Sequence, residues 1–264
     1  MTTNKRLNII DEARGFTLIS MILYHFCWDL KYIAGFSLEW YTGPLGYVWQ
    51  RSICMSFIII SGFCFCMGKN RLKRSATVFA AGLIITAVTL IAMPENRIVF
   101  GVLTFLGTAG LIMIPVDKIH RILERKLDTR TINLTMIIGS ILLFVVFYDV
   151  NYGMLFVGHK MELPAYLYSG YFETFLGFPD PMFYSTDYFS ILPWIFLYMA
   201  GYYIYRLVMC VKASEAVCDA LSRNRFKSIA FIGRKSLIIY MLHQPVLYAI
   251  TLLIMKLFGE THGL

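Results

Sequence analysis

Charged residues are scarce in this chain. Only 15% of its 264 residues are Asp, Glu, Lys or Arg, whereas 58% are hydrophobic and the mean hydropathy is +0.64. An ordinary soluble domain carries about 25% charged residues, so the composition excludes a typical soluble globular protein. Several apolar runs approach the roughly 20 residues that an α-helix needs to cross a bilayer. The sequence therefore predicts an all-α, polytopic membrane protein.

Motifs for metal binding and for processing are also missing. The six cysteines fall mostly in apolar runs, and Cys64 and Cys66 are two positions apart, so on a helix they point in different directions. We expect neither a metal site nor a disulfide framework from them. No small-residue cleavage site follows the first apolar run, which we interpret as a retained helix. The chain shows no internal repeat, and we expect residues 1–264 to form a single transmembrane domain.

The basic residues are concentrated in some of the polar connections. The apolar runs predict about seven spans, near residues 15–35, 48–67, 76–93, 98–116, 131–149, 188–209 and 236–258. With the N-terminus in the cytoplasm, most of the 24 Lys and Arg lie on the cytoplasmic side, as the positive-inside rule requires. We therefore predict a multi-pass protein of the plasma membrane. Basic residues in separate short loops exclude nucleic acid as a partner and indicate membrane lipid head groups instead.

Two of the predicted extracytoplasmic segments, 35–46 and 150–187, are rich in aromatic residues. The longer one contains the stretch YSGYFETFLGFPDPMFYSTDYF. A connection of this length is seldom without a function. Two interpretations are open, namely an aromatic belt at the membrane surface and an aromatic-walled lid over a polar substrate.

Ionisable residues occur inside the first predicted span. Arg14 and His25 are eleven positions apart, just over three helical turns, so both lie on one helix face about 16 Å apart. Asp29 follows one turn after His25 and can accept a hydrogen bond from its imidazole. A carboxylate near the membrane centre costs about 2.5–3.5 kcal/mol. The pattern indicates a general base, His25, that is oriented by Asp29, with Arg14 at the inner mouth of a polar cavity. A buried polar tie between helices is the alternative.

The last predicted span carries a second histidine. His243 lies eight positions after Lys235, at nearly the depth of His25 in the first span. Gln244 and Pro245 follow, and a proline inside a span frees a backbone carbonyl that a cavity can use. Two histidines at similar depth favour one shared polar cavity over two separate packing residues.

Small residues interrupt two other predicted spans. Ser61 and Gly62 stand in the stretch FIIISGF, and Gly101 and Gly107 stand in FGVLTFLGTAG. They fit a cavity, but close packing between helices is the default explanation for such residues.

Six motifs occur in one order along the chain: ID-x-x-RG, YHFxxDL, FIxISGF, FGVLxFLG, DYFxxLPW and GRxSLxIYxxHQPVL. Together they resemble the catalytic domain family of the heparan-α-glucosaminide N-acetyltransferases, from Asp11 to Leu247. The spacing of Arg14 and His25 also resembles the Arg-x10-His signature of the wider membrane acyltransferase-3 group. Two departures are present. Residues 26–42 contain no histidine, where the lysosomal heparan enzyme has its catalytic one, and Thr104 stands where relatives often have histidine.

The resemblance implies transfer of an acyl group, usually acetyl from cytoplasmic acetyl-CoA, to a hydroxyl or amine of an extracytoplasmic sugar or glycan. On that interpretation His25 activates the acceptor or carries the acyl group, Asp29 orients it, and Arg14 meets the coenzyme phosphates. A homodimer is compatible with this assignment. We expect Arg14, His243, Gln244 and Ser61 to line the acyl-CoA site, and Asp187, Glu173 and Trp28 to contact the acceptor.

Two other functions are open at this point. A His–Asp pair at mid-membrane also suits a proton relay in a proton-coupled transporter, although the sequence shows neither the inverted repeat nor the paired broken helices of many transporters. A non-catalytic membrane subunit would tolerate alanine at His25 and His243. An acyl donor in the cytoplasm and an acyl acceptor outside could both reach a histidine at the midplane of the membrane. This placement favours the acyltransferase over the two other functions.

Overall fold

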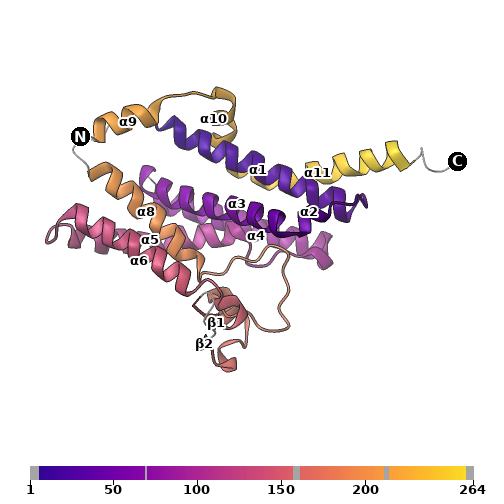
Figure 1. Ribbon diagram of the computed structural model, residues 1–264, viewed down its shortest axis with the longest axis horizontal. Coiled ribbons are helices and arrows are strands. Elements are labelled where there is room, and N and C mark those ends of the chain that lie inside the picture. The colour runs from indigo at the N-terminus through magenta and orange to yellow at the C-terminus, as the bar shows by residue number, and fades with distance from the viewer. Residues whose placement is uncertain (1–5, 69, 157–160, 211–213, 260–264) are drawn as a thin grey trace. The chain divides into compact units, whose positions relative to one another are not determined.

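The computed structural model describes residues 6–68, 70–156, 161–210 and 214–259, and nearly all of its regular structure is α-helical (Figure 1). Within this part of the chain two short strands, β1 (Met154–Leu155) and β2 (Met161–Glu162), pair in antiparallel fashion. The predicted all-α class is therefore confirmed apart from that pair. The chain forms two compact units, one from residues 1–57 and 215–264 and the other from residues 58–214.

Five helical segments are long and apolar enough to cross a membrane, namely Pro44–Met67, Arg71–Ala92, Val102–Leu123, Thr129–Tyr152 and Ser236–Leu257. Two of the seven expected spans correspond to described helices that are not both long and apolar enough to be included. One is α1 (Asn8–Tyr32), whose ionisable residues lower its hydropathy, and the other is α8 (Trp194–Cys210), which has only 17 residues. A helix of that length rises about 26 Å, slightly less than a hydrocarbon core of about 30 Å. The five apolar helices by themselves indicate a membrane protein.

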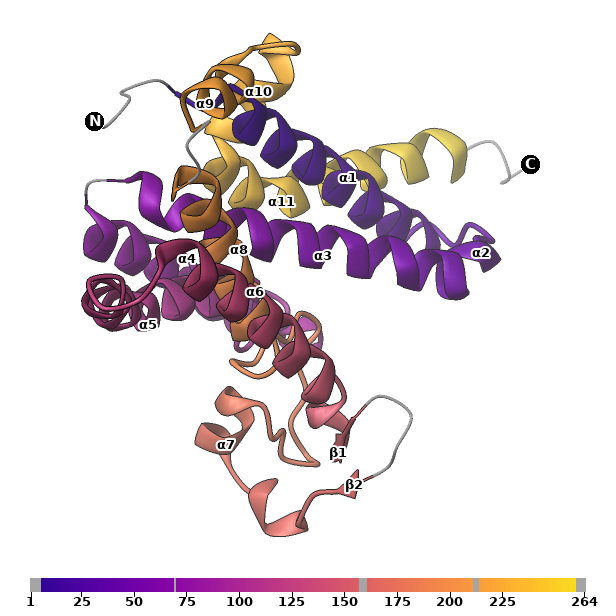
Figure 2. The same cartoon turned by 60° about the vertical axis from the view of Figure 1, so that its left-hand side comes forward.

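The first unit contains α1, α2 (Glu39–Thr42), the first part of α3 (Pro44–Cys64), most of α9 (Ser214–Ser222), α10 (Lys227–Arg234) and α11 (Ser236–Gly259). The N-terminal half of α1 packs against α10, and α11 lies alongside α1 (Figures 1 and 2). Leu18 and Met21 of α1 pack with Ile53 of α3 in an apolar core. The indole of Trp49 on α3 donates to Ser20 Oγ on α1 at 2.8 Å. These contacts hold α1 between its neighbours in this unit.

Glycine lets α10 approach α1 very closely. A Cβ atom at Gly15 would lie 2.2 Å from the carbonyl oxygen of Ile229, and a Cβ atom at Gly233 would lie 1.8 Å from that of Asp11. Both distances are far shorter than a van der Waals contact, so a side chain at either position would force the two helices apart. The glycine of the ID-x-x-RG motif is therefore explained by helix packing.

The start of α10 is held by Glu12 of the same motif. One oxygen of the buried Glu12 carboxylate accepts the backbone N–H groups of Arg225 at 2.6 Å and Phe226 at 3.0 Å. These residues precede α10, where N–H groups have no partner within the helix. A carboxylate on α1 thus fixes where α10 begins, much as an N-cap side chain does.

The second unit contains the end of α3 and the helices α4 (Arg71–Ala92), α5 (Val102–Leu123), α6 (Thr129–Val146), α7 (Tyr171–Leu176) and α8. Helix α4 packs along α5, and α6 packs along α8 (Figures 1 and 2). A Cβ atom at Gly62 would lie 2.0 Å from the carbonyl oxygen of Tyr198, and one at Gly107 would lie 2.4 Å from the backbone nitrogen of Phe79. Close helix packing, the default explanation for these small residues, is therefore confirmed at both glycines.

Helix α5 begins later than the sequence predicts. The expected span 98–116 starts in an irregular connection, and the helix itself starts at Val102. The Asp187 carboxylate accepts the backbone N–H of Val102 at 3.2 Å. A carboxylate at a helix start satisfies a free donor and favours the positive end of the helix dipole. The partner that sets this boundary is distant in sequence, which explains the error.

The long aromatic segment 150–187 folds back on the connection that precedes α5. The backbone N–H of Thr186 donates to the carbonyl of Arg97 at 3.1 Å, and that of Phe189 donates to the carbonyl of Phe100 at 2.8 Å. Residues 157–160 of the segment lie outside the described part of the chain. The rest of the segment therefore belongs to the folded structure of the second unit.

Candidate functional site

Four polar side chains of α1 and α11 meet in the first unit. The imidazole rings of His25 and His243 lie 4.9 Å apart between their centroids, at an interplanar angle of 60°. One turn further along α1, Asp29 Oδ1 accepts a hydrogen bond from Gln244 Nε2 at 2.8 Å. The similar depths of the two histidines, read from the sequence, correspond to this contact. We call His25, Asp29, His243 and Gln244 the polar cluster.

Asp29 has a different partner from the one that the sequence suggested. The i, i+4 spacing predicts a hydrogen bond from His25 to Asp29, but among the described residues no hydrogen bond joins these two side chains. The Asp29 carboxylate, which is completely buried, binds the amide of Gln244 instead. The amide comes from the facing helix α11, so spacing along α1 alone cannot predict it.

The polar cluster contains hydrogen-bonding atoms that no described residue satisfies. Asp29 Oδ2, His243 Nε2 and Gln244 Oε1 are buried and have no partner in that part of the chain. His243 Nδ1 donates to the carbonyl of Tyr240 at 2.5 Å, so in the neutral form of the ring Nε2 is the accepting nitrogen. A buried polar atom without a partner costs about 1–3 kcal/mol. Three such atoms in one cluster need hydrogen-bond partners that the described residues do not supply.

A proline next to the polar cluster adds an acceptor. Pro245 lies inside α11 and directly follows Gln244. Proline has no N–H, so the carbonyl of Met241, four residues earlier, lacks its helical donor. The sequence predicted this free carbonyl, which lies within one turn of His243.

Arg14 lies on the same helix as His25 but contacts the start of α11. Its Nη2 donates to Ser236 Oγ at 2.9 Å, and its Nη1 is 3.6 Å from Asp11 Oδ1. Ser236 is the first residue of α11, so this contact positions the helix that carries His243. The Arg14 side chain is 34% exposed.

The other predicted site residues have separate surroundings. Trp28 on α1 packs against the ring of Tyr32, with 5.2 Å between centroids. Burial raises the pKa of the helix-capping Asp187 to about 6, and the hydrogen bond from the Val102 N–H partly offsets this effect. The second unit contains three of the predicted residues, namely Ser61 on α3, Glu173 on α7 and Asp187 before α8.

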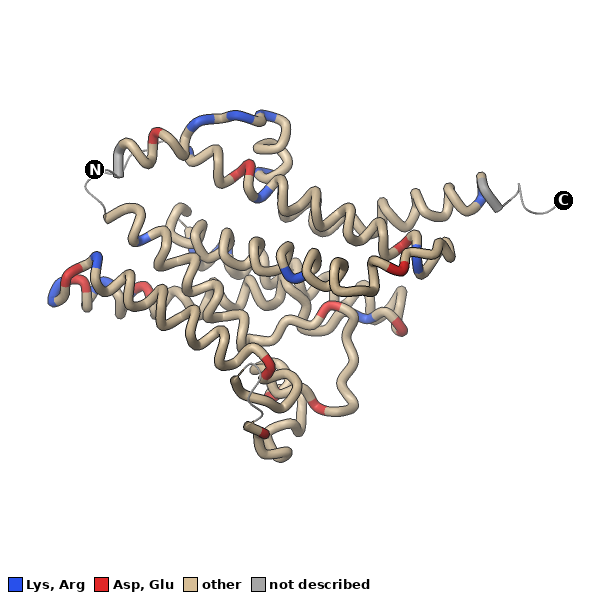
Figure 3. Tube along the Cα trace, in the orientation of Figure 1, with Lys and Arg blue, Asp and Glu red and all other residues tan. Residues whose placement is uncertain are grey.

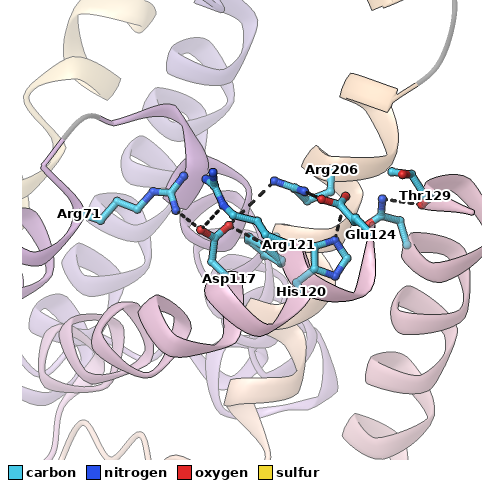
Figure 4. Close-up of polar contacts among 9 residues, drawn as sticks. Arg71, Asp117, His120, Arg121, Glu124, Thr129 and Arg206 are labelled. Atoms are coloured by element: carbon cyan, nitrogen blue, oxygen red, sulfur yellow. Dashed lines mark hydrogen bonds and ion pairs between the residues drawn. The ribbon is translucent and has the colours of Figure 1, made fainter. Parts of the chain in front are cut away.

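A further group of charged side chains joins three helices of the second unit (Figure 4). Asp117 on α5 is only 4% exposed. Its carboxylate lies 2.5 Å from Arg71 of α4 and 2.9 Å from Arg121, and it accepts the hydroxyl of Tyr202 on α8 at 2.8 Å. These partners surround a buried charge with charge-assisted hydrogen bonds.

Glu124 extends this group along α5. It pairs with Arg206 of α8, and its Oε1 lies 3.1 Å from Nε2 of His120. Arg206 also lies 3.9 Å from Asp117 Oδ1. With three arginines around two carboxylates, the group largely neutralises its own charge, which is typical of a structural clamp. We call Arg71, Asp117, His120, Arg121, Glu124 and Arg206 the ion-pair cluster.

The expected span 98–116 ends just before Asp117, and the sequence did not predict the ion-pair cluster. A signal was present, because Asp117, Arg121 and Glu124 follow each other at spacings of four and three and so share one helix face. The two arginines that complete the cluster, Arg71 and Arg206, come from other helices. No spacing in the sequence links them to Asp117.

Replacing Asp117 with asparagine tests the clamp. We expect Asp117→Asn to lower the free energy of unfolding by about 2 kcal/mol, because the amide cannot balance the arginines around it. Thermal unfolding of the purified protein in detergent measures the change. The control is Asp128→Asn, because Asp128 caps α6 by accepting the N–H of Thr131 at 2.8 Å and asparagine caps equally well. Equal melting temperatures for the two variants would contradict the clamp.

The family model described as heparan-alpha-glucosaminide N-acetyltransferase, catalytic, matches residues 6–245. No curated protein and no solved structure matches the chain. Among the described residues, no group of three or more His, Cys, Asp or Glu side chains is placed to hold a metal ion. The family match extends from the start of α1 to Pro245 and includes every residue of the polar cluster.

Proposed function

The chain belongs to the heparan-α-glucosaminide N-acetyltransferase catalytic family, and on this basis we propose that it transfers an acetyl group from cytoplasmic acetyl-CoA to a hydroxyl or amine of an extracytoplasmic sugar or glycan. The family implies a membrane acetyltransferase with an acyl donor and a sugar acceptor. The coenzyme, the direction across the membrane and the saccharide class are our own proposal. The observation that supports it best is the polar cluster, with two histidines in contact and three unsatisfied buried atoms.

We assign the proton transfer to His25. Acetyl-CoA supplies an activated thioester, whose C–S bond breaks as the acyl carbon bonds to the acceptor oxygen or nitrogen. The imidazole of His25 takes the proton that the acceptor loses, and the proton leaves with the thiol. Asp29, held by Gln244, lies one helical turn from His25, and its Oδ2 has no partner among the described residues. Its negative charge would stabilise the imidazolium that forms.

We assign the binding of the acyl donor to Arg14 of α1, His243 and Gln244 of α11, and Ser61 of α3. Arg14, whose side chain is partly exposed, would hold a phosphate group of the donor, since arginine matches phosphate oxygens with two parallel donors. His243 and Gln244 each have one buried polar atom free to contact the donor. Ser61 is the fourth proposed donor contact, and Asp187, Glu173 and Trp28 are the proposed acceptor contacts.

We propose seven spans with a cytoplasmic N-terminus and a single domain in the plasma membrane. Lys and Arg gather in the connection from α9 to α10 and in the turn between α5 and α6 (Figure 3). In the first unit, Glu12 near the N-terminus contacts the α9–α10 connection through Arg225. In the second unit, Asp117 near the end of α5 contacts Arg71 at the start of α4. Segments that the positive-inside rule assigns to the cytoplasm thus meet each other within each unit.

The experiment that tests the function uses acetyl-CoA labelled in its acetyl group. The purified protein in detergent is incubated with this donor and with amino sugars, oligosaccharides or water, and both free CoA and labelled product are followed. We expect CoA release together with label on at least one saccharide. A protein that neither binds nor consumes acetyl-CoA would contradict the proposal, and proton-coupled transport in proteoliposomes would be the next hypothesis to measure.

A further inference from the structure

The connection from α9 to α10, together with α10 itself, carries charge of one sign. Residues 222–235 contain five Lys or Arg and no Asp or Glu, namely Arg223, Arg225, Lys227, Arg234 and Lys235. All of these residues except Arg234 are exposed. None of the five forms an ion pair with another described residue. We call residues 222–235 the basic segment, and its positive charge is not balanced within the described part of the chain.

The turn between α5 and α6, where basic residues also gather, is different. Figure 3 shows Lys and Arg along the α9–α10 connection, but it shows both signs of charge around the α5–α6 turn. There Arg121 pairs with Asp117, Arg206 pairs with Glu124, and Asp128 caps α6. Much of the charge near this turn is therefore neutralised by the protein. Of the two regions, the basic segment is the one whose cations are left for an external anion.

The backbone of the basic segment is held against α1 in the first unit. Asn8 Nδ2 donates to the carbonyl of Ser222 at 2.7 Å, and the Glu12 carboxylate accepts the backbone N–H groups of Arg225 and Phe226. Glu12 thus binds the backbone of the segment and not its cationic side chains. Because these contacts fix the segment before a partner arrives, they lower the conformational entropy that binding would cost.

The outer face of α10 combines an aromatic ring with cations. Lys227, Phe231 and Arg234 follow each other at spacings of four and three, so they share one helix face. Phe231 is 55% exposed, and the guanidinium of Arg234 lies 5.8 Å from the centroid of its ring. Ala230 and Gly233 are buried. An exposed aromatic ring between cations is typical of helices that lie in the interface of a membrane.

The basic segment also lies where a membrane span begins. Residues 236–257 of α11 are long and apolar enough to cross a bilayer, and they start two positions after the end of α10. The ring of Phe226 packs edge-on against that of Phe16 on α1, with 5.8 Å between centroids, and both rings are about half exposed. Exposed rings next to the end of a span fit the head-group region, which has an apolar and a charged side. They therefore favour a lipid surface over a soluble anion as the partner.

We propose that the basic segment binds the phosphate groups of anionic phospholipids in the leaflet that meets the first turn of α11. The exposed cations Arg223, Arg225 and Lys227 hold the phosphate oxygens through charge-assisted hydrogen bonds. Phe226 and Phe231 lie among the acyl chain ends nearest the head groups. This lipid site is independent of acetyl transfer, so it stands or falls separately from the proposed function.

Native mass spectrometry of the purified protein in detergent tests the lipid site. The protein is mixed with phosphatidylglycerol or with phosphatidylcholine of the same acyl chains, and the bound lipid is counted. We expect phosphatidylglycerol to be retained in preference. The triple variant Arg223→Gln, Arg225→Gln, Lys227→Gln should lower its retention at least tenfold, since each cation near an anionic lipid surface strengthens binding about fivefold. Equal retention of the two lipids by the wild type would overturn the proposal.

A matched triple variant controls for net charge. Arg125→Gln, Lys126→Gln and Arg130→Gln remove the same charge from the α5–α6 turn, where all three residues are exposed. We expect this variant to change the retention of phosphatidylglycerol by less than about twofold, because these residues contribute little to the proposed site. An equal loss in both variants would overturn the proposal, since net charge alone would then explain the binding.

Competition with soluble phosphates distinguishes a lipid from a free anion. Inorganic phosphate and CoA are added in turn to the complex with phosphatidylglycerol at equal ionic strength. We expect neither to displace the lipid more than sodium chloride does, because neither can use the exposed rings of Phe226 and Phe231. Displacement by either one at micromolar concentration would overturn the lipid assignment and show a site for a soluble phosphate compound.

Discussion

His25→Ala is expected to lower kcat for acetyl transfer by about 10²–10⁴-fold, the usual contribution of a positioned general base. The ring of His25 contacts that of His243, and the cluster around it contains buried polar atoms that a ligand would satisfy. Alanine removes the proposed proton acceptor and leaves the other three members of the cluster in place. The labelled acetyl-CoA assay measures the effect, with kcat and KM determined separately for donor and acceptor.

Two further variants separate catalysis from folding in this experiment. His25→Gln keeps a polar side chain of similar size but cannot take a proton, so we expect the same loss of kcat as with alanine. Thr17→Ala on the same helix is the control, because within the described residues the one hydrogen bond of the Thr17 hydroxyl goes to the Ala13 carbonyl of its own helix, at 2.9 Å. Activity of His25→Ala within about threefold of the wild type would contradict the assignment, since a general base contributes far more.

Gly233→Val is expected to destabilise the first unit severely. A Cβ atom at this position would lie 1.8 Å from the carbonyl oxygen of Asp11, which is backbone and cannot move aside as a side chain can. Overpacking usually costs about 1–3 kcal/mol and sometimes more, and we expect the upper part of that range or beyond. In a protein of this size that corresponds to a fall in Tm of roughly 10 °C. Thermal unfolding in detergent measures it.

Gly139→Ala is the matched control for this substitution. Gly139 lies inside α6, and a Cβ atom there would meet nothing within 4 Å. Alanine is a better helix former than glycine by roughly 0.5–1 kcal/mol, so we expect an unchanged or slightly higher Tm. A fall of less than about 2 °C for Gly233→Val would contradict the close packing of α1 and α10, because it corresponds to 1 kcal/mol or less.

The ID-x-x-RG motif, whose glycine packs against α10, also contributes to the candidate site. The ID-x-x-RG motif contains Glu12, which holds the start of α10, and Arg14, which contacts the first residue of α11. Both contacts lie between α1 and the segment that leads to His243. The motif therefore positions the two halves of the polar cluster relative to each other, in addition to any contact that Arg14 makes with the donor.

Helical periodicity predicted one contact of the candidate site correctly and another wrongly. Counting residues along two helices predicted that His25 and His243 lie close together, as they do, because the rise per residue of an α-helix is constant. The same counting assigned the wrong partner to Asp29, whose carboxylate binds Gln244 on the facing helix. Periodicity describes one helix, whereas the choice of a hydrogen-bond partner depends on how two helices are rotated against each other.

The sequence by itself determined that this is a helical membrane protein, which family it belongs to, and that His25 and His243 lie close together. These properties depend on composition, on local spacing and on motifs, all of which are carried by residues near each other in the chain. Only the tertiary structure decided that Arg71 and Arg206 surround Asp117 and that Asp187 caps α5. Each of these contacts joins segments that are distant in sequence, and their geometry is set by side-chain packing between helices, which periodicity within one helix does not contain.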